Sequence, residues 1–218
     1  MTTRTLHLPT GIRAVVFDLD GFLFDTENLW IEEESRLLAD YGVEYVADDR
    51  LATVGQTIDT SVAYYAHRIG LPTSAIPALR KDLTERVRAA MVQRLQPLPG
   101  AIELVRAIAS AGVPLGIASN NDRDIVLLAL EVAGLADAFD VVVSAEEVER
   151  TKPAPDVYLR ACAALGVAPS EALALEDSSS GIAAARAAGM LVYAVPQFAE
   201  TDVSAADRVL TSLEDLLR

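Results

Sequence analysis

Two aspartates, Asp18 and Asp20, stand two residues apart at the end of an apolar run in the stretch VVFDLDGFLFDTE (residues 15–27). Side chains two positions apart in an extended segment lie on the same face, so these two carboxylates repel each other. A divalent cation relieves such repulsion, and magnesium favours oxygen ligands from one or two carboxylates, water and phosphate. The pair therefore predicts a metal site that serves phosphoryl transfer.

Further groups suited to phosphate chemistry follow other apolar runs of the chain. They are the hydroxyl and amide pair Ser119 and Asn120, the acidic pair Glu176 and Asp177, and Lys152 in ERTKPAPDVY. Acidic oxygens suit a metal ion, and a lysine neutralises phosphate charge in the transition state. A helix is expected to start near Asp122, just after Ser119 and Asn120, and helix N-termini favour anions.

Each of these residues also has an ordinary structural explanation when it is taken alone. Asp-Gly is a common turn pair, and Ser119 could simply cap a helix. A single loop lysine such as Lys152 is usually solvated, and Glu176 could be a structural acid. The functional interpretation depends on all of them meeting at one place.

The elements that would bring them together are short apolar runs alternating with helical patterns. The runs are at 13–20, 113–120, 139–146, 171–177 and 190–196, with a weaker one at 207–213. Both the odd and the even positions of these runs are apolar, which is typical of parallel strands buried on both faces. Helices are expected at 101–111, 123–133, 155–165 and 181–188. This alternation predicts a doubly wound α/β fold with a mainly parallel sheet, in which the strand ends converge.

Residues 26–96 interrupt this alternation, because they contain helical patterns and no convincing strand. We expect residues 1–25 and 97–218 to form the α/β catalytic core and residues 26–96 to form an inserted α-helical cap over the strand ends. Gly55 and Gln56, in TVGQTIDTS, could form a substrate loop facing the core, or an ordinary turn between helices. The run Glu32–Glu34 is interpreted as a solvated face.

The composition limits the classes of partner and compartment. The 218 residues are 51% apolar and carry a net charge of −14, which disfavours binding to nucleic acid or to anionic membranes. The single cysteine, Cys162, excludes an intramolecular disulfide. The N-terminal stretch MTTRTLHLPTGIR lacks the apolar region of a signal peptide, and no run is long enough to span a membrane. We expect a cytoplasmic protein.

Four motifs in order along the chain resemble those of the haloacid dehalogenase-like (HAD) hydrolases. They are DLDGFLFDTE, the ASN at 118–120, TKPAPDVY and LEDSSSG. The most similar branch has an α-helical cap and includes β-phosphoglucomutase and sugar-phosphate phosphatases. The resemblance covers about residues 13–196 and implies a core sheet with strand order 5-4-1-2-3.

The resemblance also implies roles for the acidic residues. Asp18 would be the nucleophile that accepts the phosphoryl group as an aspartyl-phosphate. Asp20 would be the general acid that protonates the leaving oxygen and then the base that activates water. Magnesium would be bound by the Asp18 carboxylate, the Asp20 main-chain carbonyl and Asp177, with Glu176 in support.

Phosphate binding is assigned in the same way. Ser119 and the Asn120 backbone would hold the transferring phosphate, and Lys152 would bridge it to Asp18. These roles imply a magnesium-dependent phosphatase that hydrolyses a small phosphorylated metabolite, most simply a sugar phosphate. The resemblance implies a monomer, with a weak dimer as the alternative.

Two alternatives remain open at the level of the sequence. A β-phosphoglucomutase-like mutase would return the phosphoryl group to another sugar hydroxyl. That branch carries a histidine about where Trp30 falls, and neither His7 nor His67 can take its place. A phospho-accepting signalling module would use a similar acceptor aspartate and lysine, but Asp20 argues against it because a second carboxylate hastens hydrolysis of the phosphoryl group.

Overall fold

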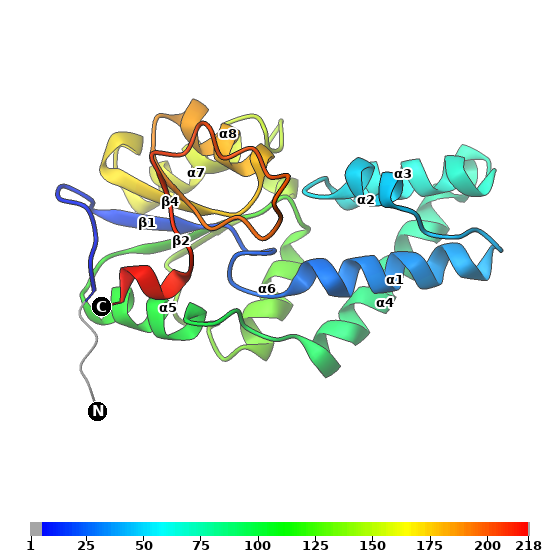
Figure 1. Ribbon diagram of the computed structural model, residues 1–218, viewed down its shortest axis with the longest axis horizontal. Helices are drawn as coiled ribbons and strands as arrows, with labels where there is room; N and C mark the ends of the chain where they lie inside the picture. Colours follow the sequence, from blue (N-terminus) through cyan, green and yellow to red (C-terminus); the bar gives the residue numbers. More distant parts are fainter. Residues whose placement is uncertain (1–5, 218) are drawn as a thin grey trace.

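A six-stranded parallel sheet forms the centre of the structure, a computed structural model that describes residues 6–217 (Figure 1). Its order is β3-β2-β1-β4-β5-β6. The strands are β1 (Ala14–Phe17), β2 (Leu115–Ala118), β3 (Val141–Val143), β4 (Ala172–Glu176), β5 (Leu191–Ala194) and β6 (Arg208–Val209). The predicted strands and the order 5-4-1-2-3 are confirmed, and β6 extends the sheet beyond β5. Residues 1–5, part of the stretch predicted to lack a signal peptide, lie outside the described residues.

Helices cover both faces of the sheet, as expected for strands that are apolar on both sides. On one face lie α5 (Ala101–Ser110) and α6 (Arg123–Val132), and on the other lie α7 (Asp156–Leu165) and α8 (Ser179–Ala188) (Figure 1). In β1, Val15 and Phe17 join the hydrophobic core of the first pair, whereas Ala14 and Val16 join that of the second. This alternation is the period-two geometry of a strand, and it leaves β1 fully buried at the middle of the sheet.

Four α-helices fill the segment between β1 and α5. They are α1 (Thr26–Asp40), α2 (Ala47–Thr53), α3 (Ile58–Ile69) and α4 (Ile76–Arg94), and together they are called the helical segment below. Figure 1 shows this segment beside the sheet, at the end where β1 leads into α1. The long helices α1 and α4 pack against each other, and α4 also packs against α6 of the core. The helical segment therefore stands over the carboxyl ends of the central strands.

The prediction that Glu32–Glu34 form a solvated face is wrong for two of the three residues. Glu32 is exposed, but Glu33 and Glu34 are only 5% and 4% exposed. Glu33 is paired with Arg36 and, at 3.0 Å, with Arg94. Glu34 instead faces the interior of the helical segment, where the Tyr45 hydroxyl lies 3.5 Å from its Oε2. The sequence could not show this because burial here is set by the packing of α1 against several partners.

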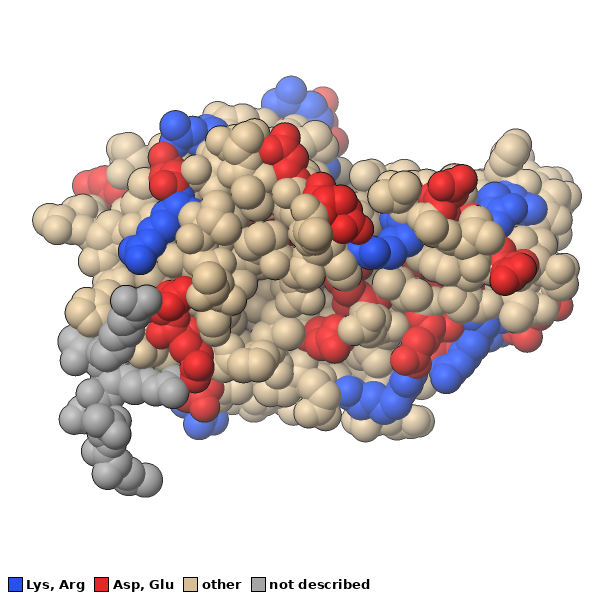
Figure 2. Space-filling model, viewed as in Figure 1, with Lys and Arg blue, Asp and Glu red and all other residues tan. Residues whose placement is uncertain are grey.

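Charged side chains of both signs lie side by side over the helical segment and the core, as Figure 2 shows for one face of the molecule. Some of them join the two parts, since Arg80 of α4 pairs with Asp122 at 2.6 Å and Arg88 pairs with Asp124. Within residues 6–217, no helix combines the length and the apolar character that crossing a membrane requires.

Candidate active site

The turn after β1 places the two predicted aspartates beside β4. The Asp18 backbone N–H donates to the Leu175 carbonyl at 2.9 Å, and the turn closes with a 3.0 Å hydrogen bond from Gly21 N to Phe24 O. Gly21 has a φ of +69°, and a Cβ there would lie 2.3 Å from Asp177 Oδ2. Only glycine fits this position, so the turn can bring the chain close to the Asp177 carboxylate.

Lys152 is buried between carboxylates from two strands. Its Nζ lies 2.5 Å from Asp18 Oδ1 and 2.6 Å from Glu176 Oε1, and the Tyr158 hydroxyl donates to the same Glu176 oxygen at 2.6 Å. Burial lowers the pKa of Lys152, but the charges of Asp18 and Glu176 outweigh it and raise the pKa overall. The lysine is therefore a protonated cation fixed next to Asp18.

The acidic groups outnumber that one cation. Ligand atoms of Asp18, Glu176 and Asp177 lie within 4.8 Å of one another. Burial and mutual repulsion raise the pKa of both Asp18 and Asp177 well above the usual range, although Lys152 opposes the rise. Asp177 Oδ1 is buried and makes no hydrogen bond within the described chain. A buried, unsatisfied oxygen in an acidic cluster fits a hard divalent cation such as Mg²⁺.

The three carboxylates are not equally free to bind such an ion. Both oxygens of Glu176 are already engaged, because Oε1 accepts from Lys152 and Tyr158, and Oε2 accepts from Ser178 Oγ at 3.1 Å. Glu176 is also fully buried, and a Cβ on Gly181 would overlap its carboxylate at 1.7 Å. Asp18 and Asp177 consequently have the more available oxygens.

Asp20 has one oxygen held in place and one left open. Its Oδ2 accepts hydrogen bonds from Asn121 Nδ2 at 2.7 Å and from Ser119 Oγ at 3.3 Å. Its Oδ1 is buried and has no hydrogen-bond partner among residues 6–217. Burial raises the pKa of Asp20, and the neighbouring Thr26 hydroxyl and the hydrogen bond from Asn121 limit the rise. This carboxyl can therefore carry a proton on an oriented oxygen.

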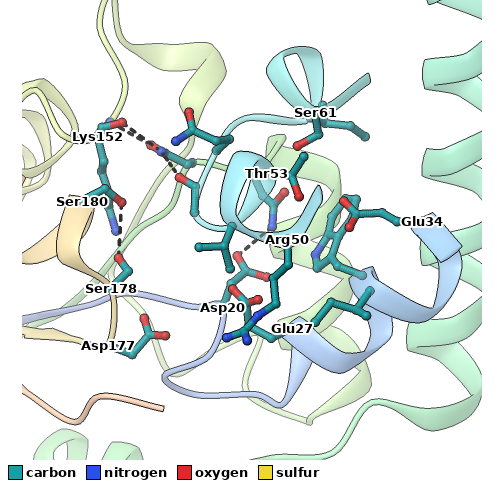
Figure 3. A pocket seen from close by; sticks show the side chains of 18 of the residues that line it. Asp20, Glu27, Glu34, Arg50, Thr53, Ser61, Lys152, Asp177, Ser178 and Ser180 are labelled. Carbon is teal, nitrogen blue, oxygen red and sulfur yellow. Dashed lines mark hydrogen bonds between the residues drawn. The ribbon is translucent and has the colours of Figure 1, made fainter. Parts of the chain in front are cut away.

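A cavity of about 70 Å³ separates these core residues from the helical segment. Figure 3 shows Glu34, Thr53 and Ser61 of the helical segment on one side, and Lys152 and Asp177 on the other. Pockets that hold small ligands typically measure ~300–1,000 Å³. The cavity is therefore small for a substrate of several carbon atoms, but Glu27, Arg50 and Gln56 also line an adjoining cavity of about 300 Å³.

The predicted loop residues Gly55 and Gln56 both line this cavity. The Asn120 side chain ties that loop to the core, since its Nδ2 donates to Gly55 O at 3.0 Å and to Lys152 O at 3.2 Å. The Asn120 Oδ1 also accepts from Lys152 N at 2.9 Å. Asn120 thus links the helical segment to the loop that carries the buried lysine.

The structure gathers every residue predicted for the site around one cavity or within its hydrogen-bond network. It also adds residues that the sequence analysis did not assign: Asn121, Tyr158, Glu27, Glu34 and Arg50. Two of these had a possible signal, because Asn121 follows the ASN motif and Tyr158 belongs to TKPAPDVY. The three from the helical segment had none, since nothing in the sequence indicates which helix faces turn toward the core.

Replacing Lys152 with Met is expected to destabilise the fold by about 3–5 kcal/mol, because it leaves Asp18 and Glu176 buried without their cation. Urea denaturation at neutral pH measures this. The loss should shrink at lower pH as the carboxylates take up protons. The chain's other lysine, Lys81, is the matched control because it is exposed and lies 3.8 Å from Glu85. An equal loss in both variants would contradict the prediction.

Glu34→Gln is expected to stabilise the protein by on the order of 1–3 kcal/mol at pH 8. Burial raises the pKa of Glu34 from its usual value near 4.5 to about 7. Because the folded state holds this proton more tightly, ionisation opposes folding above pH 7. The stabilisation should disappear as the pH falls from 7 towards 4.5. Denaturant titrations of both proteins at pH 8 and pH 4.5 test this. An equal difference in the free energy of unfolding at the two pH values would contradict the prediction.

The chain is similar in sequence and in structure to several known proteins. A family model described as haloacid dehalogenase-like hydrolase matches residues 15–195. Hexitol phosphatase B of Escherichia coli (strain K12) is 35% identical over 226 residues, covering 97% of this chain and 100% of that protein. Protein CbbY of Rhodobacter capsulatus is 35% identical over 207 residues, covering 90% and 91%. A crystal structure of CbbY from Rhodobacter sphaeroides in complex with phosphate has a TM-score of 0.86 at 28% identity, covering 94% and 96%.

Proposed function

The chain belongs to the haloacid dehalogenase-like hydrolases, and we propose that it is a magnesium-dependent phosphatase acting on a small sugar phosphate through an aspartyl-phosphate. The observation that carries this proposal is the arrangement of Asp18 between Lys152 and Asp177, with Asp20 beside it. The similarity to hexitol phosphatase B supports a sugar phosphate as the substrate class.

In the first step, an Asp18 carboxylate oxygen attacks phosphorus, and the bond from phosphorus to the ester oxygen breaks. Asp20 gives its proton to that leaving oxygen, so the sugar departs as a neutral alcohol. The raised pKa of Asp20 supports this role, since the acid must be protonated when the substrate binds. Lys152 holds the Asp18 carboxylate in position and offsets negative charge on the phosphoryl group.

In the second step, water attacks the phosphorus of the aspartyl-phosphate and Asp20, now ionised, takes one of its protons. The bond from phosphorus to Asp18 breaks, inorganic phosphate leaves, and both aspartates return to their starting forms. Asn121 and Ser119 keep the Asp20 carboxyl oriented through both steps, because they hold its Oδ2 and leave Oδ1 to exchange the proton.

The Asp18 and Asp177 carboxylates and the Asp20 main-chain carbonyl would hold the magnesium ion. When bound, the ion supplies positive charge that reduces repulsion between the carboxylates and the phosphate. We assign Glu176 to a supporting role, because both of its oxygens already have protein donors. Ser119, the Asn120 backbone and Lys152 would bind the phosphate, and Gly55 and Gln56 would contact the substrate from the helical segment.

We also propose that residues 26–96 act as a mobile cap on a core made of residues 1–25 and 97–218. The small volume of the cavity between the two parts supports this, and so does the loop contact from Asn120 to Gly55 across it. Closure would exclude bulk water from the aspartyl-phosphate until hydrolysis.

A phosphate-release screen over hexose, pentose, polyol and glycolate phosphates, with and without magnesium, tests the proposed function. We expect magnesium-dependent release that is fastest for a sugar or polyol phosphate. An isomerised sugar phosphate in place of inorganic phosphate would indicate a mutase. A stable phosphorylated protein without turnover would indicate a signalling module.

Magnesium is expected to raise the melting temperature of the protein, because it binds the folded acidic cluster and not the unfolded chain. At a concentration 100 times the dissociation constant, the stabilisation is about 2.7 kcal/mol. Asp177→Asn should abolish most of this shift, since it removes a carboxylate whose Oδ1 has no protein partner. Differential scanning fluorimetry in EDTA and in magnesium measures both. An undiminished shift in the variant would remove Asp177 from the metal site.

A further inference from the structure

One face of α1 lines the cavity from the active site outward. Glu27, Trp30, Ile31 and Glu34 all border it, and they are spaced as i, i+3, i+4 and i+7. Residues at this spacing lie along one side of a helix. With a rise of ~1.5 Å per residue, the stripe spans roughly 10 Å from Glu27 to Glu34. Glu34 is therefore at the end of the cavity remote from the α1 N-terminus, where the part of a substrate distant from its phosphate would lie.

Glu34 is a buried carboxylate without a cationic partner among the described residues. It is 4% exposed, and no lysine, arginine or histidine of the described residues forms an ion pair with it. Its neighbouring donors are two tyrosine hydroxyls: Tyr45 donates to Oε2 at 3.5 Å, and hydrogen bonding to Tyr65 lowers the pKa of Glu34 against the effect of burial. Buried carboxylates normally have close donors, because an unpaired charge in a protein interior is unfavourable. Glu34 also lines the cavity, so a ligand there can supply further donors.

The surroundings of Glu34 favour hydroxyl groups over a second phosphate. Thr53 and Ser61 add hydroxyls to the cavity wall, and Trp30 adds an aromatic surface. The cationic residue on this side, Arg50, lies 3.3 Å from Glu200 and stacks on the Phe198 ring at 3.7 Å, and its Nε has no hydrogen-bond partner among the described residues. Carboxylate and hydroxyl acceptors beside an aromatic wall match an uncharged polyhydroxy compound, whereas Glu34 and Glu27 would repel a second phosphate.

We propose that Glu34 binds hydroxyl groups of the substrate and so makes the enzyme select monophosphates of uncharged sugars or sugar alcohols over sugar bisphosphates. The inference rests on the proposed phosphatase function, which supplies the phosphate end of the substrate. Glu34 accepts hydrogen bonds from hydroxyls remote from the phosphate, and its negative charge excludes a second phosphoryl group from the same place.

The test compares kcat/KM for a hexitol monophosphate, fructose 1,6-bisphosphate and p-nitrophenyl phosphate, whose leaving group carries no hydroxyl beyond the ester oxygen. At pH 8, above the pKa of about 7 of Glu34, Glu34→Gln should lower kcat/KM for the hexitol phosphate about 10-fold and Glu34→Leu about 100-fold. The loss should come mainly through KM, because hydrogen bonds to a charged acceptor are the stronger kind. For p-nitrophenyl phosphate, both variants should stay within about twofold. In both variants, the ratio of kcat/KM for the hexitol monophosphate to that for fructose 1,6-bisphosphate should fall by at least about 10-fold.

Glu33→Gln is the matched control, because Glu33 is the neighbouring buried glutamate on α1 but is paired with arginines and does not line the cavity. It should leave all three substrates unchanged relative to one another. Equal losses on p-nitrophenyl phosphate, or no loss on the hexitol phosphate in the Glu34 variants, would overturn the inference.

If the Glu34 variants lost no activity on the hexitol phosphate, the sugar would lie elsewhere, for example in the adjoining cavity of about 300 Å³ beside Phe198 and Thr201. If the unsubstituted protein released no phosphate from any of the three substrates, the proposed function itself would fail, and the inference with it. Release from p-nitrophenyl phosphate by all variants, with hexitol phosphate turnover indifferent to Glu34, would overturn the inference alone.

Discussion

Asp18→Asn is expected to lower kcat by about 10⁴- to 10⁶-fold on every phosphomonoester, the size of loss seen when a catalytic nucleophile is removed. The amide cannot form an acyl-phosphate, and no other carboxylate takes its place: Glu176 is held by Lys152 and Tyr158, and Asp20 by Asn121 and Ser119. Initial-rate assays with p-nitrophenyl phosphate in saturating magnesium measure the loss.

The Asp18→Asn variant should remain folded, because Lys152 keeps its 2.6 Å contact with Glu176. A melting temperature in EDTA no lower than that of the unsubstituted protein would establish this, since Asp18 is a buried acid whose pKa is raised by burial and by its acidic neighbours. Rapid quenching followed by mass spectrometry should find a phosphoryl adduct on the unsubstituted chain and none on the variant. Hydrolysis by the variant at the original rate would show that the nucleophile is a different residue.

Asp20→Asn is expected to lower kcat by about 10²- to 10⁴-fold on a sugar phosphate, the usual contribution of general acid–base catalysis. The amide keeps the size of the side chain but has no proton to donate from the position of Oδ1. A sugar alkoxide is a poor leaving group and needs that proton, whereas p-nitrophenolate does not. The first step should therefore be impaired much less with p-nitrophenyl phosphate. Because the variant hydrolyses its aspartyl-phosphate slowly, the phosphorylated enzyme should then accumulate, and p-nitrophenol should be released in an initial burst.

Asp25→Asn is the matched control for Asp20, because it changes the third aspartate of the same stretch. Asp25 accepts a 2.8 Å hydrogen bond from Asn28 and does not line the cavity. Its substitution should leave kcat within about twofold, as is usual for surface changes away from a site. If Asp20→Asn retained full activity on a sugar phosphate, or if its first step were slowed by the same factor on both substrates, the acid role of Asp20 would be wrong.

The sequence determined the core of the fold because its signals are local. Runs in which odd and even positions are both apolar specify strands covered on both faces. Such strands must be joined by helices. Once the sheet is parallel, the residues that follow each strand meet at one edge. The sequence alone therefore places Asp18 and Lys152, 134 residues apart, at the same edge, and in the structure Lys152 Nζ lies 2.5 Å from Asp18 Oδ1.

Only the tertiary structure decided the details within the site and nearly everything about the helical segment. The hydrogen bond from Asn121 to Asp20, across 101 residues, depends on side-chain directions that no periodicity encodes. Glu33 and Glu34 are neighbours of the same type, yet one is paired with arginines and the other borders the cavity. The physical reason is that helical periodicity says which residues share a face, whereas the packing of separate helices decides what each face meets.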